Sequence, residues 1–209
     1  MEVIKSLGIM GGTFDPIHYG HLTAAECARS EFDLDKVLFI PSARPPHKEL
    51  DLVSDCNDRY TMVRSAIADN PGFEISSLEI QRKGLSYTVD TIDYYLHKYS
   101  GTKIFFILGL DALLLINTWK EVERLVELCQ FVAVARPGYQ IELNDRYLKG
   151  LPEVLWKNVH FMEIPGNTIS SSDIRQRVLT GKPIKYLVPP VVEEYIYCRG
   201  LYMNKECRI

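Results

Sequence analysis

The sequence contains few cysteines and no paired cysteine motif. Five cysteines are scattered among the 209 residues, and no C-x-x-C occurs. An odd number of isolated cysteines is typical of reduced thiols in a cytoplasmic protein. The sequence also lacks an apolar run of membrane-spanning length, and its N-terminus lacks the three regions of a signal peptide. We therefore expect a cytoplasmic protein without a membrane partner.

Basic residues are not in excess either. The 24 Lys and Arg residues stand against 27 Asp and Glu residues, which gives a net charge of −3. This balance argues against nucleic acid as a partner, although it leaves room for a local phosphate pocket. No internal repeat or low-complexity tract is present. The length suits one domain over residues 1–209, with a helical C-terminal portion expected from about residue 170.

Motifs built on an enzyme nucleophile are missing as well. The sequence has no G-x-S-x-G, and Gly181-Lys182-Pro183 is not a P-loop because no G-x-x-x-x-G precedes it. This absence fits a reaction in which the substrate supplies the nucleophile. The protein would then need only to position the reactants and to neutralise developing charge.

What the chain does contain, at its start, is the pattern of a strand, a glycine-rich loop and a helix. The apolar run Val3–Met10 ends at Gly11 and Gly12, and a helical pattern follows. Glycines let backbone N–H groups approach a ligand, and a helix N-terminus adds donors, so this segment suits a phosphate. His18 and His21 are three residues apart and would point the same way. Imidazoles can donate hydrogen bonds to a phosphate.

Two other interpretations of this segment stay open on the residues alone. One is a glycine turn that carries two surface histidines. The other is a zinc site, although His18 and His21 have no third ligand nearby in the sequence.

The remaining apolar runs alternate with helical patterns, which predicts an α/β protein with a Rossmann-like, doubly wound parallel sheet. The first strand would be central, with the run Lys103–Gly109 as its second neighbour. Ligands of such sheets bind outside the carboxyl ends of the strands. The other predicted strands are Lys36–Pro41, Phe73–Ser76, Leu78–Gln81 (extended), Phe131–Ala135 and the edge strand Val159–Met162; the predicted helices are Asn57–Asp69, Val89–Tyr99, Ala112–Ile116, Glu121–Cys129 and Val191–Cys198.

Several polar residues stand where helices are expected to begin, and each has two interpretations. Thr88 and Asp111 could cap their helices, or they could bind a ligand, Asp111 through ribose hydroxyls. The serines 170–172 form either a good helix cap or, with Arg175 on the first turn, an anion site.

The loop motif has a wider resemblance. The string G-G-T-F-D-P-I-H over Gly11–His18 runs into H-x-G-H at His18-Tyr19-Gly20-His21. This combination resembles the bacterial nicotinate mononucleotide adenylyltransferases of the nucleotidylyltransferase superfamily. The resemblance covers essentially the whole length, since further family segments follow in order: Ser42–Lys48 (S-x-x-x-P-P-H-K), Ser86–Thr88 (S-Y-T), Gly109–Asp111 (G-x-D), Trp119 and Ile169–Arg175 (I-S-S-S-x-I-R).

The resemblance implies a direct, in-line transfer of AMP from ATP to nicotinate mononucleotide, without a covalent intermediate, in NAD biosynthesis. Mg²⁺ would accompany ATP, and we expect no metal ion held by side chains. His18, His21 and Arg175 would be catalytic. The residues placed on ATP are Gly11, Thr13, Phe14, His18, His21, Lys48, Gly109, Asp111, Ser172 and Arg175; those placed on nicotinate mononucleotide are Gly12, Thr13, Tyr87, Thr88, Trp119 and Arg136.

Two rival functions share the first motif. A phosphopantetheine adenylyltransferase also carries H-x-G-H, but the S-Y-T segment and Trp119 argue against it. A nucleotide-sensing protein could keep the fold and lose turnover, against which the intact His18, His21 and Arg175 argue. Side chains alone do not decide between the acid and amide forms of the mononucleotide. A homo-oligomer also stays open, because residues 139–158 or the last helix could form an interface.

Overall fold

A six-stranded parallel sheet forms the centre of the computed structural model, which describes residues 4–44, 53–82, 84–135, 153–165 and 168–204. The strand order is β3-β2-β1-β4-β5-β6, and every neighbouring pair is parallel. The strands are β1 (Ser6–Gly12), β2 (Lys36–Pro41), β3 (Phe73–Ile75), β4 (Lys103–Gly109), β5 (Gln130–Ala135) and β6 (Val159–Glu163).

The central strands confirm the predicted sheet. β2 and β4 have the predicted bounds, β1 lies between them, and β6 is at the edge. β4 is buried on both faces because its side chains alternate between two cores. Phe105 and Ile107 join one core, whereas Ile104, Phe106 and Leu108 join the other. This burial explains why its sequence is a continuous apolar run rather than an alternating one.

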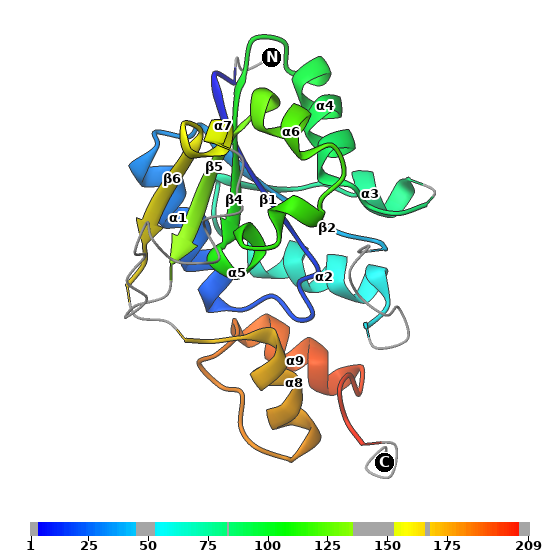
Figure 1. Ribbon diagram of the computed structural model, residues 1–209. Coiled ribbons are helices and arrows are strands. Elements are labelled where there is room, and N and C mark those ends of the chain that lie inside the picture. Colours follow the sequence, from blue (N-terminus) through cyan, green and yellow to red (C-terminus); the bar gives the residue numbers. More distant parts are fainter. Residues whose placement is uncertain (1–3, 45–52, 83, 136–152, 166–167, 205–209) are drawn as a thin grey trace.

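Helices cover both faces of the sheet (Figure 1). The buried apolar side chains of α1 (Tyr19–Glu31) and α2 (Cys56–Ala66) belong to the first core. The buried apolar side chains of α4 (Thr88–Lys98), α6 (Val122–Leu128) and α7 (Glu153–Trp156) belong to the second core. No helix in the described part of the chain is long and apolar enough to span a membrane.

The last two helices, α8 (Ser171–Leu179) and α9 (Pro190–Cys198), lie beyond the end of the sheet to which the strand arrows point (Figure 1). Ile174 of α8 and Val192 of α9 are fully buried in the same core as α1 and α2. Hydrogen bonds join this C-terminal portion to the first loop and to α1. Ser171 Oγ donates to the Pro16 carbonyl at 2.9 Å, and the Tyr19 N–H donates to the Leu187 carbonyl at 3.1 Å.

The structure corrects some local expectations: one predicted extended segment was wrong, and the cap interpretations of Thr88 and Asp111 are rejected. Leu78–Gln81 is not extended but forms the short helix α3, closed by a bond from the Gln81 N–H to the Ser77 carbonyl at 2.9 Å. Thr88 is not a cap, because Tyr87 is the N-cap of α4 and Thr88 is its first helical residue.

Asp111 is not a cap either. Gly109 is the N-cap of α5 (Leu110–Leu113), and Asp111 lies in the first turn of that helix. The helix expected over Ala112–Ile116 is therefore shorter and begins earlier, and a 3₁₀ turn, η2 (Ile116–Thr118), follows it.

Candidate active site

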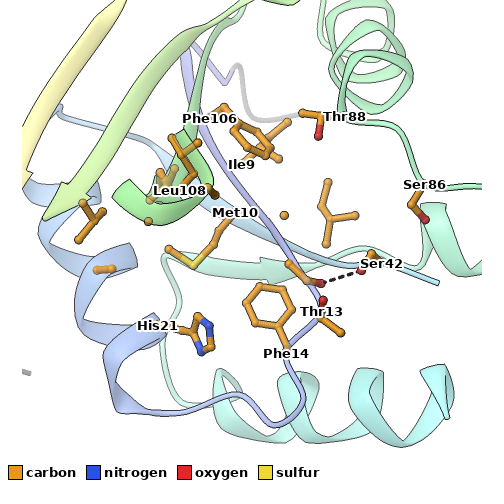
Figure 2. A pocket seen from close by; sticks show the side chains of 18 of the residues that line it. Ile9, Met10, Thr13, Phe14, His21, Ser42, Ser86, Thr88, Phe106 and Leu108 are labelled. Atoms are coloured by element: carbon orange, nitrogen blue, oxygen red, sulfur yellow. Dashed lines mark hydrogen bonds between the residues drawn. The ribbon is translucent and has the colours of Figure 1, made fainter. Parts of the chain in front are cut away.

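A cavity of about 720 Å³ opens where β1 and β4 end and the first loop, α1 and α4 begin (Figure 2). Its position agrees with the rule that ligands bind outside the carboxyl ends of parallel strands. Most of the predicted site residues line it, namely Gly11, Gly12, Thr13, Phe14, His18, His21, Tyr87, Thr88, Gly109 and Trp119.

The first loop is held by its carbonyl groups. The Gly12 carbonyl accepts from the Ser42 N–H at 2.9 Å and from Ser42 Oγ at 3.3 Å (Figure 2). The Thr13 carbonyl accepts from Arg59 Nη1 at 2.7 Å. In a planar trans peptide the N–H points opposite to the C=O, so the N–H groups of Thr13 and Phe14 turn away from these partners. Phe14 has a φ of 49°, and left-handed residues of this kind occur in backbone nests that bind anions.

His18 and His21 form the entrance to α1. His18 is the N-cap residue, and its N–H donates to Nδ1 of His21 at 3.3 Å. His21 therefore takes the place that Glu holds in the usual capping box. Because Nδ1 accepts a hydrogen bond, the neutral ring of His21 carries its proton on Nε2. The two ring centroids are 3.8 Å apart, and His18 is only 6% exposed. This geometry rejects the interpretation of two surface histidines.

Gly20 makes room for the first histidine. A Cβ at this position would lie 2.9 Å from Nδ1 and 3.0 Å from Cε1 of His18. The His18 ring thus packs directly against the glycine backbone. The glycine in H-x-G-H is required by a close approach rather than by an unusual φ.

The opposite wall of the cavity is aromatic and polar. Figure 2 shows Thr88 and Ser86 across the cavity from His21. Tyr87 and Thr88 begin α4, so the unpaired donors of a helix N-terminus lie at this wall. Trp119 packs edge-on against Phe106, with centroids 5.8 Å apart, and it is only half-buried. This wall therefore offers a flat apolar surface beside hydrogen-bond donors.

Glu79 is a residue of this wall that the sequence did not reveal. It is 7% exposed and lines the cavity from α3. Its Oε1 accepts from Thr91 Oγ1 at 2.8 Å, and Arg82 Nη1 donates to the same hydroxyl at 3.4 Å. Burial raises the pKa of the Glu79 carboxyl, and hydrogen bonds from Thr91 and Ser86 oppose this rise. Because Leu78–Gln81 was predicted to be extended, the sequence did not indicate that Glu79 lines the cavity.

Some predicted residues lie elsewhere. Ser172, Arg175 and Asp111 are not among the described residues that line the cavity, whereas Ser170 and Ser171 are. Ser170 caps α8 by accepting from the Asp173 N–H at 3.2 Å, so the cap interpretation is confirmed for Ser170.

Arg175 reaches the first loop instead of the cavity. Its Nη1 donates to the Asp15 carbonyl at 2.8 Å, and its Nη2 donates to Ser172 Oγ at 3.3 Å. Lys48 and Arg136, which the family resemblance assigned to the two substrates, lie outside the described residues.

The described residues contain no group of three or more His, Cys, Asp or Glu side chains that could hold a metal ion. The alternative of a zinc site at His18 and His21 therefore finds no third ligand in this part of the chain.

Comparison with known proteins places this geometry in a family. A model of the cytidylyltransferase-like family matches residues 9–177. A probable nicotinate-nucleotide adenylyltransferase of Moorella thermoacetica is 52% identical over 197 residues, which cover 94% of this chain and 91% of the relative. The chain belongs to the nicotinate-nucleotide adenylyltransferase family. A second member of the family, from Thermoanaerobacter, is 48% identical over 207 residues and covers 99% of this chain and 98% of its own.

The fold of this family is also found in solved structures. The nicotinic acid mononucleotide adenylyltransferase of Plasmodium falciparum, in complex with NaAD, has a TM-score of 0.78 at 23% identity and covers 95% of this chain and 97% of its own. At that identity the likeness concerns the fold, which is the Rossmann-like nucleotidylyltransferase fold. The resemblance noted in the sequence and the predicted fold class are both confirmed.

Proposed function

We propose that the chain transfers AMP from ATP to nicotinate mononucleotide and releases pyrophosphate and nicotinate adenine dinucleotide, as a step of NAD biosynthesis. The observation that carries this proposal is a single cavity with two different ends. One end has the paired histidines and the loop backbone, and the other has the start of α4 beside Trp119. A relative that is 52% identical bears the name of a probable nicotinate-nucleotide adenylyltransferase.

The reaction is one displacement at phosphorus. A phosphate oxygen of nicotinate mononucleotide forms a bond to the α-phosphorus of ATP, and the bond from that phosphorus to the bridging oxygen breaks. The electron pair leaves with pyrophosphate. The substrate supplies the nucleophile, so catalysis consists of positioning and of stabilising negative charge. Mg²⁺ enters with ATP as part of the substrate and neutralises the departing phosphates.

The phosphates belong at the histidine end. Nε2–H of His21 and the N–H groups of Thr13 and Phe14 would donate to oxygens that gain charge in the transition state. His18 and Gly11 complete this end, and Gly109 faces the nucleoside from β4.

Arg175 acts from behind the loop in this proposal. Its bond to the Asp15 carbonyl supports the loop, and its remaining charge attracts the triphosphate. The sequence resemblance adds Ser172, Lys48 and Asp111 to the ATP side.

The pyridine ring belongs at the other end. Tyr87 and Thr88 would offer N–H groups at the start of α4 to the ring carboxylate, because a helix N-terminus favours an anion. Trp119 and Gly12 would contact the ring itself, and the resemblance adds Arg136. A carboxylate suits this arrangement better than an amide, which also needs an acceptor for its N–H groups. Since scattered cysteines are typical of reduced thiols, we place the reaction in the cytoplasm.

The proposal is tested by pyrophosphate release from ATP and Mg²⁺ with three acceptors. We expect turnover with nicotinate mononucleotide to exceed turnover with nicotinamide mononucleotide, and none with phosphopantetheine. Turnover with phosphopantetheine alone would keep the histidine chemistry but reject the assignment of Tyr87, Thr88 and Trp119. ATP binding without pyrophosphate release from any acceptor would identify a nucleotide sensor and reject the enzyme.

A further inference from the structure

Behind the first loop, three polar side chains from distant parts of the chain meet. Asp15 of the loop and Arg59 of α2 are buried, with 2% and 1% of their surface exposed. Tyr202, which follows α9, donates its O–H to Asp15 Oδ1 at 2.7 Å. We call Asp15, Arg59 and Tyr202 the loop-support cluster. None of the three is among the described residues that line the cavity, so the cluster contacts the loop from its far side.

The cluster controls the backbone of the loop. Arg59 Nη1 donates to the Thr13 carbonyl at 2.7 Å, and Arg59 Nε donates to the Ser54 carbonyl at 2.9 Å. Tyr202 fixes the carboxylate of Asp15, which also accepts from the Ser54 N–H at 3.4 Å. The two residues on either side of Phe14 are thereby held in place. Since Phe14 adopts a left-handed φ of 49°, its peptide N–H depends on these neighbours for its direction.

Stability alone is a weak explanation for such a cluster. Burying a guanidinium and a carboxylate has a large desolvation penalty, and apolar replacements of similar volume are often as stable. Burial lowers the pKa of Arg59, and the charge of Asp15 opposes this shift. Burial also raises the pKa of Tyr202, so its O–H stays a neutral donor. What the cluster provides that an apolar core could not is a fixed direction for loop carbonyls.

We propose that Tyr202 and Arg59 are positioning residues for adenylyl transfer, which act through Asp15 and the Thr13 carbonyl to aim the loop N–H groups at the reacting phosphate. This inference rests on the proposed function for its catalytic readout. It makes the segment after α9 a part of the active-site machinery, although Tyr202 is 187 positions away from Asp15.

The chain offers a matched control for Tyr202. Tyr195 of α9 also donates its O–H to a carboxylate in the N-terminal half, Asp58 Oδ1, at 2.8 Å. Asp58 lies in α2 and is not a loop residue. Tyr202→Phe and Tyr195→Phe therefore remove the same kind of bond at a similar length, but only the first bond reaches the loop.

The first experiment compares the steady-state kinetics and the thermal unfolding of both variants with the unaltered chain. For Tyr202→Phe we expect kcat to fall about tenfold, the effect of losing one hydrogen bond to a charged group, with both KM values within twofold. For Tyr195→Phe we expect kcat within twofold of the parent. Equal kcat in the two variants, or a fall in kcat that follows a matching fall in Tm in both, would overturn the inference.

A second pair of measurements does not need turnover. Hydrogen–deuterium exchange of the loop backbone should be about tenfold faster in Tyr202→Phe and unchanged in Tyr195→Phe. Arg59→Lys should behave like Tyr202→Phe, because one ammonium cannot reproduce the guanidinium fork. If the unaltered chain shows no transfer, the proposed function fails, but exchange still tests the cluster. Unchanged loop exchange in both Tyr202→Phe and Arg59→Lys would overturn it.

Discussion

Replacing Gly20 with Ala should separate activity from stability. The new Cβ would lie 2.9 Å from His18 Nδ1 and 3.5 Å from the Ile169 carbonyl. Real Cβ atoms do not approach other heavy atoms within 3.0 Å, so the His18 ring has to shift by a few tenths of an ångström. It cannot shift freely, because His18 is 6% exposed and the ring of His21 lies 3.8 Å away.

The substitution should leave the stability nearly unchanged but lower the activity. Alanine is favoured over glycine in helices by up to about 1 kcal/mol, and Gly20 is the second residue of α1. That gain offsets the strain of a small ring displacement, so Tm should stay within about 3 °C of the parent. A misplacement of about 1 Å can lower a rate by about 10², so a smaller shift of His18 should lower kcat by about tenfold.

The assay is pyrophosphate release with ATP and nicotinate mononucleotide, alongside thermal unfolding followed by circular dichroism. Ser30→Ala is the control, since it raises helix propensity at the exposed far end of α1 without a change near His18. We expect normal kcat for Ser30→Ala. A normal kcat for Gly20→Ala would refute the argument that catalysis needs His18 in its place against the glycine. A large fall in Tm would refute the claim that activity falls without a loss of stability.

Three further predictions follow from the cavity. His21→Ala should lower kcat by about 10²–10³, the loss expected for one transition-state donor, and near-normal turnover would reject its role. Trp119→Ala should raise the KM for nicotinate mononucleotide roughly three- to tenfold without changing the KM for ATP. The control Trp156→Ala, on α7, should lower only the stability. Similar KM values for nicotinate mononucleotide in both variants would mean that the pyridine ring does not bind at Trp119. Burial in the folded state raises the pKa of Glu79 above its ordinary 4.5 and so favours the neutral acid. Because the unfolded chain ionises first, the parent should lose stability as pH rises from about 4.5 through the folded pKa. In urea unfolding between pH 4.5 and 8, Glu79→Gln should lack that loss, and parallel pH curves for the two proteins would contradict the assignment.

The sequence predicted the elements that are long and uniform. β4 was predicted at its observed bounds because Ile104–Leu108 are buried on both faces and all apolar, and because Lys103 and Gly109 mark the two ends of the run. The strand–loop–helix at the N-terminus was predicted because its glycines and histidines are close in sequence. Most of the predicted site residues that line the cavity could likewise be named because they belong to short motifs.

The failures concern short segments and long-range contacts. Four residues, Leu78–Gln81, are too few to show a helical period, and the inward direction of Glu79 depends on Thr91, 12 positions away. Arg59 occupies an ordinary polar position in a helical pattern, and its partner is the Thr13 carbonyl, 46 positions away. A contact made to a backbone group leaves no trace in residue type, so no motif could have revealed it.

The stereochemistry at the α-phosphorus tests most directly the central claim that the protein positions two substrates for one displacement. The substrate would be one diastereomer of adenosine 5′-(1-thiotriphosphate), turned over with nicotinate mononucleotide, and the configuration of the thio-dinucleotide product would be determined. A single in-line transfer predicts inversion at phosphorus. Retention would mean two displacements through a covalent adenylyl-enzyme, and it would contradict the conclusion that this chain supplies no nucleophile.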